Sequence, residues 1–563
     1  MPRYLLAAEA DKIQDFIFRS AKLREVVGGS RLLARFCSEG VKELRKKHDN
    51  KPEVLISDGG AFRIVFDDEI TARDFGNDLA ELYLRCAGGV LTVADPVEYD
   101  DSNDERFKKC YHAAQEQLRS AKSRGDKAAT AVHLPYTAFC ASCGVGLASG
   151  HRKKNESDTR SRANYLCADC RNKTEEKFDQ DRIFIGAFGE SLLKELGDTE
   201  KLPQIKFELN DRDWVDLICK ADARSYVAYL LADGNGMGQL FSQCNRTQLE
   251  YLSKELTNSL RHSLAKPCAT MIRSQGEALK VLEGKLPVVP LILGGDDLFA
   301  LLPAPFALDF ATEFCQIYEE TMTAILARPE TNLSDQPKPT ITAAVVICKR
   351  SYPHTLAHQR AECALKQAKE MARRIEVTTG KRVSTLNFDV VTGNQVTADS
   401  AGNDHHYRAS LRPYFISDAA PADWGINMQN LIEARVTLKA LPAKRRSEFE
   451  KLYADLPDDK KKPTEEGDFR SRWKPQFEGQ LKRLGVQDAN SQEEDSLEKR
   501  DKLPVRVLEA LKLLGGAQKE SGYLRRVERA PSPDWYANGL SDLLEAWDFA
   551  FKLDKPMDEY WEE

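Results

Sequence analysis

Residues 288–302 read VVPLILGGDDLFALL, so two apolar runs flank a Gly-Gly-Asp-Asp tetrapeptide. Each run has the length and composition of a buried strand, and Gly294-Gly295 supplies the positive φ angles that a tight hairpin requires. The hairpin would present Asp296 and Asp297 side by side at one edge of a sheet. Because adjacent carboxylates repel each other unless a cation lies between them, the motif predicts a divalent metal site, most naturally for magnesium that carries nucleotide phosphates. A polar hairpin tip without a metal is the alternative.

A second acidic residue follows another apolar run. Residues 226–231 read YVAYLL and lead into Ala232-Asp233-Gly234-Asn235-Gly236. An aspartate at the end of a buried strand can bind a metal, and a glycine-rich turn into a helix lets backbone amides approach phosphates closely. Asp233 is therefore a second candidate metal ligand, although the same pattern is also typical of an ordinary turn.

Two basic residues on a later helix are candidates for phosphate contacts. Lys369 and Arg373 are four positions apart on a helix expected at residues 354–374, so their side chains project from the same side. Together they could reach a triphosphate, and solvated surface charges are the alternative.

The order of the apolar runs predicts one architecture twice. The first copy is expected to begin with a strand and a short helix capped by Asp11, after which Gly28-Gly29-Ser30 interrupts the chain before a helix at residues 31–47. A hairpin, a helix and a strand complete this copy, and the second copy repeats the order around the Gly-Gly-Asp-Asp hairpin. This order is the ferredoxin-like pattern. The first hairpin tip, Ser57-Asp58-Gly59-Gly60-Ala61, has no carboxylate after its glycines, so the first copy is expected to lack the acidic pair.

Four cysteines in two C-x2-C pairs indicate a structural zinc site. Cys140 and Cys143 form one pair, Cys167 and Cys170 form the other, and 23 residues lie between the pairs. Two such pairs are typical of tetrahedral zinc in a reduced protein. The segment has little apolar mass, so zinc binding, worth about 10–16 kcal/mol at such sites, would dominate its folding. Two matched pairs argue against the alternative, a redox dithiol.

The composition limits the class of protein. Hydrophobic residues make up 42% and charged residues 30% of the 563 residues, which is typical of a globular chain with several domains. The net charge is −6, whereas a chain that grips nucleic acid unaided is usually basic. Any RNA would therefore be held largely by other subunits.

The sequence has no run of 18 apolar residues and no signal peptide, and its isolated cysteines suit a reduced, cytoplasmic protein without membrane contacts. After about residue 395 the pattern predicts helices only.

These features together resemble one family, the large Palm-domain (polymerase/cyclase) subunit of type III CRISPR effector complexes, and within it the Cmr type. The resemblance covers residues 3–395, and it rests on five segments. They are Lys12-Ile13-Gln14-Asp15-Phe16-Ile17-Phe18, Gly28-Gly29-Ser30, the four-cysteine insert, Asp233-Gly234-Asn235 and Gly294-Gly295-Asp296-Asp297.

The resemblance implies an α+β chain with two ferredoxin-like, nucleotide-cyclase-like Palm domains. The first Palm, without the acidic pair, would occupy residues 1–130, and a zinc-binding module with a connecting segment would occupy residues 131–222. The second Palm, with the Gly-Gly-Asp-Asp site, would occupy residues 223–395, and an all-helical C-terminal domain would occupy residues 396–563. Many family members begin with an HD nuclease domain; this chain starts at the first Palm, so DNA cleavage is not expected of it.

The resemblance also implies an activity, the synthesis of cyclic oligoadenylate second messengers from ATP when the complex pairs its guide with target RNA. Other type III subunits, CRISPR RNA and target RNA would be the partners. Asp233, Asp296 and Asp297 would be catalytic and would hold two magnesium or manganese ions. The residues implied to bind nucleotide are Gly28, Gly29, Ser30, Gly234, Asn235, Gly294, Gly295 and Lys369. Two alternatives are another cyclase of the GGDEF-like type and a non-catalytic scaffold that binds RNA and partner proteins; the duplicated Palm counts against the first, and the acidic trio against the second.

Overall fold

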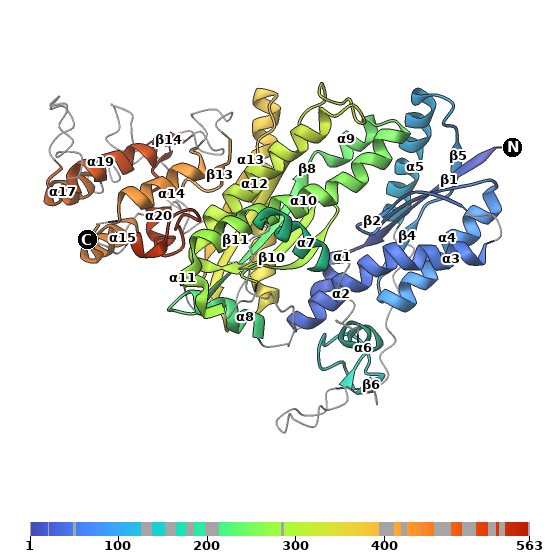
Figure 1. Cartoon of the computed structure of the whole chain (residues 1–563), viewed down its shortest axis with the longest axis horizontal. Coiled ribbons are helices and arrows are strands. Elements are labelled where there is room, and N and C mark those ends of the chain that lie inside the picture. Colours follow the sequence, from blue (N-terminus) through green and yellow to red (C-terminus); the bar gives the residue numbers. More distant parts are fainter. Residues whose placement is uncertain are drawn as a thin grey trace.

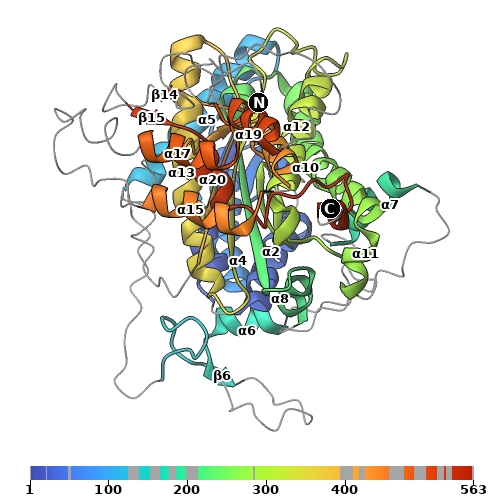
Figure 2. The same ribbon diagram turned by 90° about the vertical axis from the view of Figure 1, so that its left-hand side faces the viewer.

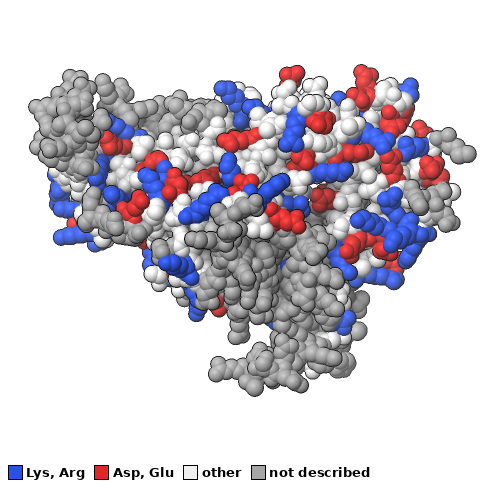
Figure 3. Space-filling model, in the orientation of Figure 1, with Lys and Arg blue, Asp and Glu red and all other residues white. Residues whose placement is uncertain are grey.

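Two β-sheets follow one another along the long axis of the molecule, and C-terminal helices lie at the end away from the first sheet (Figure 1). This computed structural model describes residues 2–20, 22–48, 52–124, 138–151, 165–175, 185–197, 213–282, 286–392, 410–417, 425–439, 441–454, 474–486, 503–515, 525–527 and 535–560. In those ranges no helix is both long enough and apolar enough to cross a membrane. Acidic and basic side chains are interspersed over the face drawn in Figure 3.

The first sheet belongs to a ferredoxin-like unit, called here the first unit. Its strands lie in the order β2-β3-β1-β4, β5 also pairs with β1, and all these pairings are antiparallel. Along β1, Leu5 and Ala7 face one core and Leu6 and Ala8 the other, as alternation along a strand requires. The strands are β1 (Arg3–Asp11), β2 (Glu53–Asp58), β3 (Ala61–Phe66), β4 (Val90–Val93) and β5 (Val97–Tyr99). The helices are α1 (Ile13–Phe18), α2 (Leu23–Arg35), α3 (Val41–Lys47), α4 (Glu69–Ala87) and α5 (Asp104–Arg124).

The second sheet repeats this order and extends it. Its path is β13-β12-β11-β8-β10-β9, in which β9, β10, β8 and β11 correspond to β2, β3, β1 and β4. The added strand β12 runs parallel to β11, because α13 connects the two. The strands are β8 (Tyr226–Asn235), β9 (Val289–Gly294), β10 (Asp297–Pro303), β11 (Thr340–Lys349), β12 (Thr385–Val390) and β13 (Tyr414–Phe415). The main helices are α9 (Met237–Gln243), α10 (Arg246–Ser274), α12 (Ala307–Leu326) and α13 (His354–Thr379). The predicted duplication of architecture is thus confirmed.

Two expectations about the first unit are wrong. The segment Gly28-Gly29-Ser30 does not interrupt the chain, because α2 runs through it and a π-helix (Phe36–Gly40) then leads into α3. Asp11 does not cap α1, since it is the last residue of β1 and Lys12, at φ 49°, takes the N-cap position without a side-chain hydrogen bond. Asp11 instead accepts a hydrogen bond from the hydroxyl of Thr92.

The C-terminal region is helical, as expected, but it also contains strands. Among the described residues, β13 extends the second sheet, and β14 (Arg525–Val527) pairs with β15 (Trp535–Ala537). The apolar stretch at residues 539–553 forms only one short helix, α20. The helices are α14 (Met428–Thr437), α15 (Ala443–Ala454), α17 (Lys474–Arg483), α19 (Leu503–Leu513) and α20 (Leu540–Glu545). They gather in front in Figure 2.

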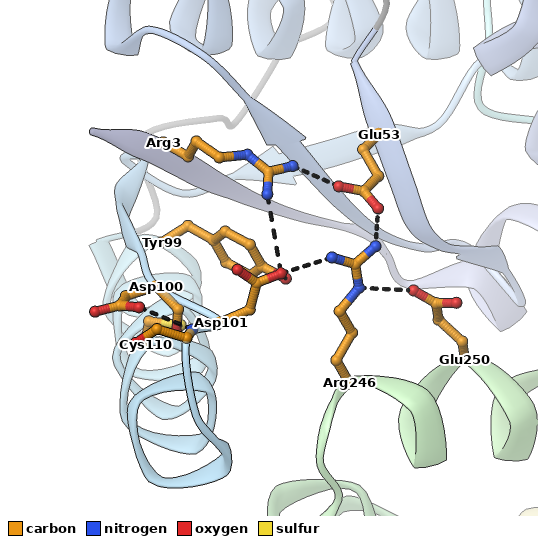
Figure 4. A network of polar contacts seen from close by, with 9 residues as sticks. Arg3, Glu53, Tyr99, Asp100, Asp101, Cys110, Arg246 and Glu250 are labelled. Carbon is orange, nitrogen blue, oxygen red and sulfur yellow. Dashed lines mark hydrogen bonds and ion pairs between the residues drawn. The ribbon is translucent and has the colours of Figure 1, made fainter. Parts of the chain in front are cut away.

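A polar network joins the two units (Figure 4). Arg246, at the start of α10 in the second unit, forms ion pairs with Glu53 of β2 and with Asp101, the latter at 2.6 Å. Arg3 of β1 pairs with the same two carboxylates, at 2.5 and 3.9 Å. The four side chains are about one-third exposed, and Glu250 of α10 adds a further pair at 3.2 Å.

Candidate active site

The strand register brings two of the three predicted aspartates together. Asp297, the first residue of β10, pairs with Asp233 on β8, so the two side chains lie on the same face of the sheet. Asp296 lies in the turn before β10, and its carbonyl accepts a hydrogen bond from the Gly234 N–H at 3.2 Å. A Cβ on Gly234 would lie 2.8 Å from that of Asp296, so the approach of the two segments requires glycine. At the hairpin tip only Gly295, at φ 60°, adopts the left-handed region; Gly294 does not.

Lys369 contacts this acidic site directly. Its Nζ lies 2.6 Å from Oδ2 of Asp233, and both side chains are about one-third exposed. Lys369 lies on α13, which packs across β8 and β11. The Asp233 carboxylate is thus turned toward a lysine. Within the described ranges, the aspartate oxygens are not drawn together within 4.8 Å of one another, a condition that only the four-cysteine set meets.

The carboxyl groups of Asp296 and Asp297 are both shifted toward the protonated form. Burial, and to a lesser extent the charge of Asp233, raise the pKa of Asp296 to about 6. Burial, and to a lesser extent repulsion from Asp233 and Asp296, raise the pKa of Asp297 to about 7. The positive charge of Lys369 opposes both shifts. Buried, crowded carboxylate oxygens are the ligand type that magnesium and manganese prefer, so these residues fit a hard divalent cation.

The first unit carries a related set of residues that sequence reasoning missed. Glu9 of β1 lies opposite Thr92 of β4, just as Asp233 of β8 lies opposite Thr342 of β11. Lys122 on α5 lies 3.0 Å from Glu9, which parallels the ion pair between Lys369 and Asp233. The only sequence signal was an acidic residue near the end of the first strand, and nothing local indicated its lysine partner.

The two hairpin tips face each other across the units. A Cβ on Gly59, at the tip of the first hairpin, would lie 3.7 Å from the Cα of Gly295 at the tip of the second. Ala61 pairs with Glu9 where the second unit pairs Asp297 with Asp233, so the first hairpin lacks the acidic pair, as predicted. Glu9 is near enough that its charge contributes to raising the pKa of Asp296.

The structure gives Gly28 and Gly29 a packing role. A Cβ on Gly28 would lie 2.0 Å from the carbonyl oxygen of Lys173, and one on Gly29 would lie 3.3 Å from the Lys173 side chain. Lys173 belongs to α6 (Ala168–Glu175), the helix of the cysteine-bearing module. These glycines let α2 and α6 approach each other closely, and Ser30 is buried beside them. Their role in binding nucleotide stays a prediction.

The four predicted cysteines come together. Cys140, Cys143, Cys167 and Cys170 place their sulfurs within 4.8 Å of one another and could hold a metal ion. The sulfurs of Cys143 and Cys167 are 3.8 Å apart. Two thiolates bound tetrahedrally to zinc at about 2.3 Å would be about 3.8 Å apart, so the set fits zinc.

The fold and the acidic site together define a palm-type protein, in which a duplicated ferredoxin-like unit carries aspartates at its strand ends. Residues 226–378 match the family described as "Cas10/Cmr2, second palm domain". This part of the chain is therefore similar to the second palm domain of that family, and the two ferredoxin-like units are referred to below as the first and second palm.

The comparisons also find similar solved structures. The Csm1–Csm4 cassette in complex with cA4 is 14% identical, over 92% of this chain and 70% of that chain, with a TM-score of 0.44. Csm1 of T. onnurineus is 14% identical, over 91% of this chain and 69% of that chain, with a TM-score of 0.47. The Csm1–Csm4 cassette in complex with one ATP is 15% identical, over 91% and 70%, with a TM-score of 0.46. No curated protein matches the chain.

Proposed function

We propose that this chain is the large subunit of a type III CRISPR RNA-guided effector complex and converts ATP into cyclic oligoadenylates when the complex recognises target RNA. The observation that carries the proposal is the set of Asp233, Asp296, Asp297 and Lys369 at the strand ends of a Cas10/Cmr2-type palm domain. A scaffold gains nothing from buried carboxylates whose charges repel one another, whereas a metal-dependent enzyme needs them.

The reaction joins the 3′-oxygen of one ATP to the α-phosphorus of another. The bond from that phosphorus to the oxygen bridging to the β-phosphate breaks, pyrophosphate leaves, and the hydroxyl proton passes to solvent. Such a transfer needs alignment and charge neutralisation more than covalent help from the protein. A pair of magnesium or manganese ions, when bound, would make the hydroxyl more acidic and neutralise the triphosphate. Asp233, Asp296 and Asp297 would hold these ions, and Lys369 would move from Asp233 to a phosphate.

The second ATP would lie on the first palm, opposite the acidic hairpin. The facing hairpin tips support this arrangement, because they bring the strand ends of both palms to one interface. Gly234, Asn235, Gly294 and Gly295 would present backbone at this interface. Of these, Asn235 donates hydrogen bonds from its side-chain Nδ2 to the hydroxyl oxygens of Thr342, at 2.8 Å, and Thr340, at 3.1 Å. Its side chain is therefore fixed before a nucleotide binds.

The partners follow from the family and from charge. The other type III subunits would hold CRISPR RNA and target RNA, because the net charge of this chain is −6 and a chain that grips RNA alone is usually basic. Zinc in the four-cysteine site would be structural, since four thiolates leave no open coordination position for chemistry.

The test is chromatography of the products that the purified complex forms from ATP and magnesium, with and without target RNA. Cyclic oligoadenylates are expected only with target RNA, and the double substitution Asp296→Asn with Asp297→Asn should abolish them. The matched control is Asp335→Asn, an exposed carboxylate of the same palm, which should leave the yield unchanged. Product from the double variant would reject the site, a cyclic dinucleotide alone would favour a GGDEF-like enzyme, and no product from any complex would favour a scaffold.

A further inference from the structure

The cysteine-bearing module lies against the first palm, where its helix α6 packs on α2 (Figure 1). Backbone N–H groups within the module donate hydrogen bonds to three of the four predicted ligand sulfurs, those of Cys140, Cys143 and Cys167, at 3.4, 3.4 and 3.5 Å. Such bonds stabilise the negative charge of a thiolate. They are local to the module, whereas the sulfur of Cys170 has a contact from outside it.

That contact is made by Ser20, which lies between α1 and α2 of the first palm. Ser20 is 0% exposed, and its hydroxyl oxygen lies 3.7 Å from the sulfur of Cys170. A metal ligand must be a thiolate, which has no proton to donate, so the hydroxyl is the donor in the metal-bound form. Hydrogen bonds to metal ligands from a surrounding shell of residues strengthen metal binding. The first palm therefore contributes one such bond to the metal site of the module.

A buried lysine beside Cys170 also favours the metal-bound form. Lys173 follows Cys170 by one turn of α6 and is 1% exposed, and in the described ranges it forms no ion pair with a carboxylate. Its Nζ donates to the carbonyl of Phe16 and lies 4.1 Å from the centroid of that ring. A buried ammonium group without an anion is costly. A divalent metal with four thiolates carries a net negative charge and would supply that anion.

Ser20 also contacts the helix that carries Lys369. The backbone carbonyl of Ser20 accepts a hydrogen bond from Nε2 of His354, the first residue of α13, at 3.2 Å. One turn further on, the ring of His358 stacks on Phe18 of α1, with the ring centroids 3.5 Å apart. Lys369 lies on the same helix, about 22 Å from His354 at 1.5 Å per residue. Ser20 thus lies between the cysteine site and the start of α13.

We propose that Ser20 is a positioning residue of the four-cysteine metal site and that it couples metal binding to the order of the start of α13. Its hydroxyl stabilises the metal-bound thiolate of Cys170, and its carbonyl holds His354. Because one fully buried residue makes both contacts, loss of the metal weakens the first contact and loosens the second. The inference concerns the metal site and α13, and it does not depend on the synthesis of oligoadenylates.

The first experiment measures the metal site of the full chain, by competition for zinc with a chelator and by the absorption spectrum of the cobalt-loaded protein. Ser20→Ala should lower the zinc affinity about tenfold. It should also move the sulfur-to-cobalt charge-transfer band to longer wavelength, because a sulfur without a hydrogen bond gives up electrons more easily. Ser20→Thr keeps the hydroxyl and should restore both values. The matched control is Ser263→Ala, which removes an equally buried hydroxyl that bonds within α10 and should change neither.

The second experiment measures amide hydrogen exchange in the unaltered chain, so it does not depend on the folding of any variant. Removal of zinc by a chelator should speed exchange in α6 and in the first turns of α13, and should leave α12 unchanged. Ser20→Ala with zinc bound should reproduce part of the change in α13, because the hydroxyl that fixes Ser20 against Cys170 is lost.

Three results would overturn the inference. The first is an unchanged zinc affinity and cobalt band in Ser20→Ala, or an equal change in Ser263→Ala. The second is faster exchange in α6 without any change in α13 when zinc is removed, which would mean that the metal acts only within the module. The third is a parent chain that binds neither zinc nor cobalt. None of these measurements uses ATP, so a complex that makes no oligoadenylate would leave the inference standing.

Discussion

The two adjacent aspartates of the second hairpin would carry the proposed chemistry, and burial is the larger influence on their protonation. The motif predicted mutual repulsion, and the structure adds desolvation as the larger cause of the raised pKa values of Asp296 and Asp297. Both carboxyl groups bind protons more tightly in the fold than when free in water. A proton and a divalent cation bound here would therefore compete for the same oxygens near neutral pH.

The affinity for manganese should depend on pH. With pKa values of about 6 for Asp296 and about 7 for Asp297, both groups are mostly ionised at pH 8, whereas at pH 6 Asp297 is largely protonated and Asp296 about half protonated. Binding should weaken roughly 20-fold between these values, because the metal must displace the protons. Calorimetric titration at several pH values measures the change, and the variant with Asp296→Asn and Asp297→Asn should retain only weak, pH-independent binding. Constant affinity of the parent protein from pH 6 to 8 would contradict the assignment.

The residues of the acidic hairpin were predictable because they are local in sequence. Two apolar runs around Gly-Gly-Asp-Asp indicate strands and a turn without knowledge of the rest of the chain. The ion pair between Glu9 and Lys122 was missed, since it depends on the return of α5 across the sheet.

At the scale of elements, α2 shows why a glycine pair need not end a helix. Glycine is intrinsically unfavourable within helices, and this cost underlies the wrong expectation of an interruption at Gly28-Gly29-Ser30. The helix persists because α6 packs onto the glycines. Polar contacts add to this packing, since Glu25 of α2 is buried and accepts hydrogen bonds from Ser142 and Thr174 of the cysteine-bearing module.

Substitution of Gly28 by alanine should loosen the cysteine-bearing module. The new methyl group would meet the carbonyl of Lys173 at 2.0 Å, and overpacking of this kind costs about 1–3 kcal/mol. We expect a lower unfolding temperature and faster transfer of zinc to a chelator. Gly479→Ala is the matched control, because Gly479 lies within α17 and a Cβ there contacts nothing within 4 Å; alanine should stabilise that helix slightly. If both variants gain stability, the close contact of α2 with α6 is not real.

Most helices and strands of the two palms were predictable from apolar periodicity, because each palm buries both faces of its sheet. The helix α13 begins at His354, as expected, and continues beyond the expected end at residue 374 to Thr379. The elements of the C-terminal region were harder to predict from the sequence. The strand β13 is only two residues long and depends on β12 as its partner, and the apolar stretch after α20 packs as irregular chain, with Leu553 donating to buried Asp309 of α12 at 2.7 Å.

At the scale of the whole molecule, the two palms form one body around shared cores. Val227 and Tyr229 of β8 belong to the same core cluster as Leu6 and Ala8 of β1. The ion pairs of Arg246 with Glu53 and Asp101, drawn in Figure 4, add polar contacts between the two palms. The candidate active site lies where the hairpin tips of the two palms meet, so its geometry depends on this interface.

Substitution of Arg246 should weaken the interface between the two palms. In the Arg246→Met variant, Glu53 and Asp101 lose a shared cation, and Arg3 alone remains between them. We expect a loss of about 1 kcal/mol in the free energy of unfolding by urea at low salt, and a smaller loss at about 1 M salt, where such pairs are screened. The control is Arg85→Met, which removes an exposed pair with Glu81 on α4 and should have no measurable effect. An equal effect at both salt concentrations would mean that packing, not charge, accounts for the loss.

In the proposed function, Asp233, Asp296 and Asp297 hold two metal ions beneath a triphosphate. The most direct measurement is anomalous diffraction from crystals of the chain grown with manganese and an ATP analogue that resists cleavage at the α-phosphate. Two manganese peaks about 3.5–4 Å apart are expected, ligated by these three aspartates, with Lys369 released from Asp233. Manganese bound elsewhere, or a nucleotide whose phosphates do not contact the second hairpin, would contradict it.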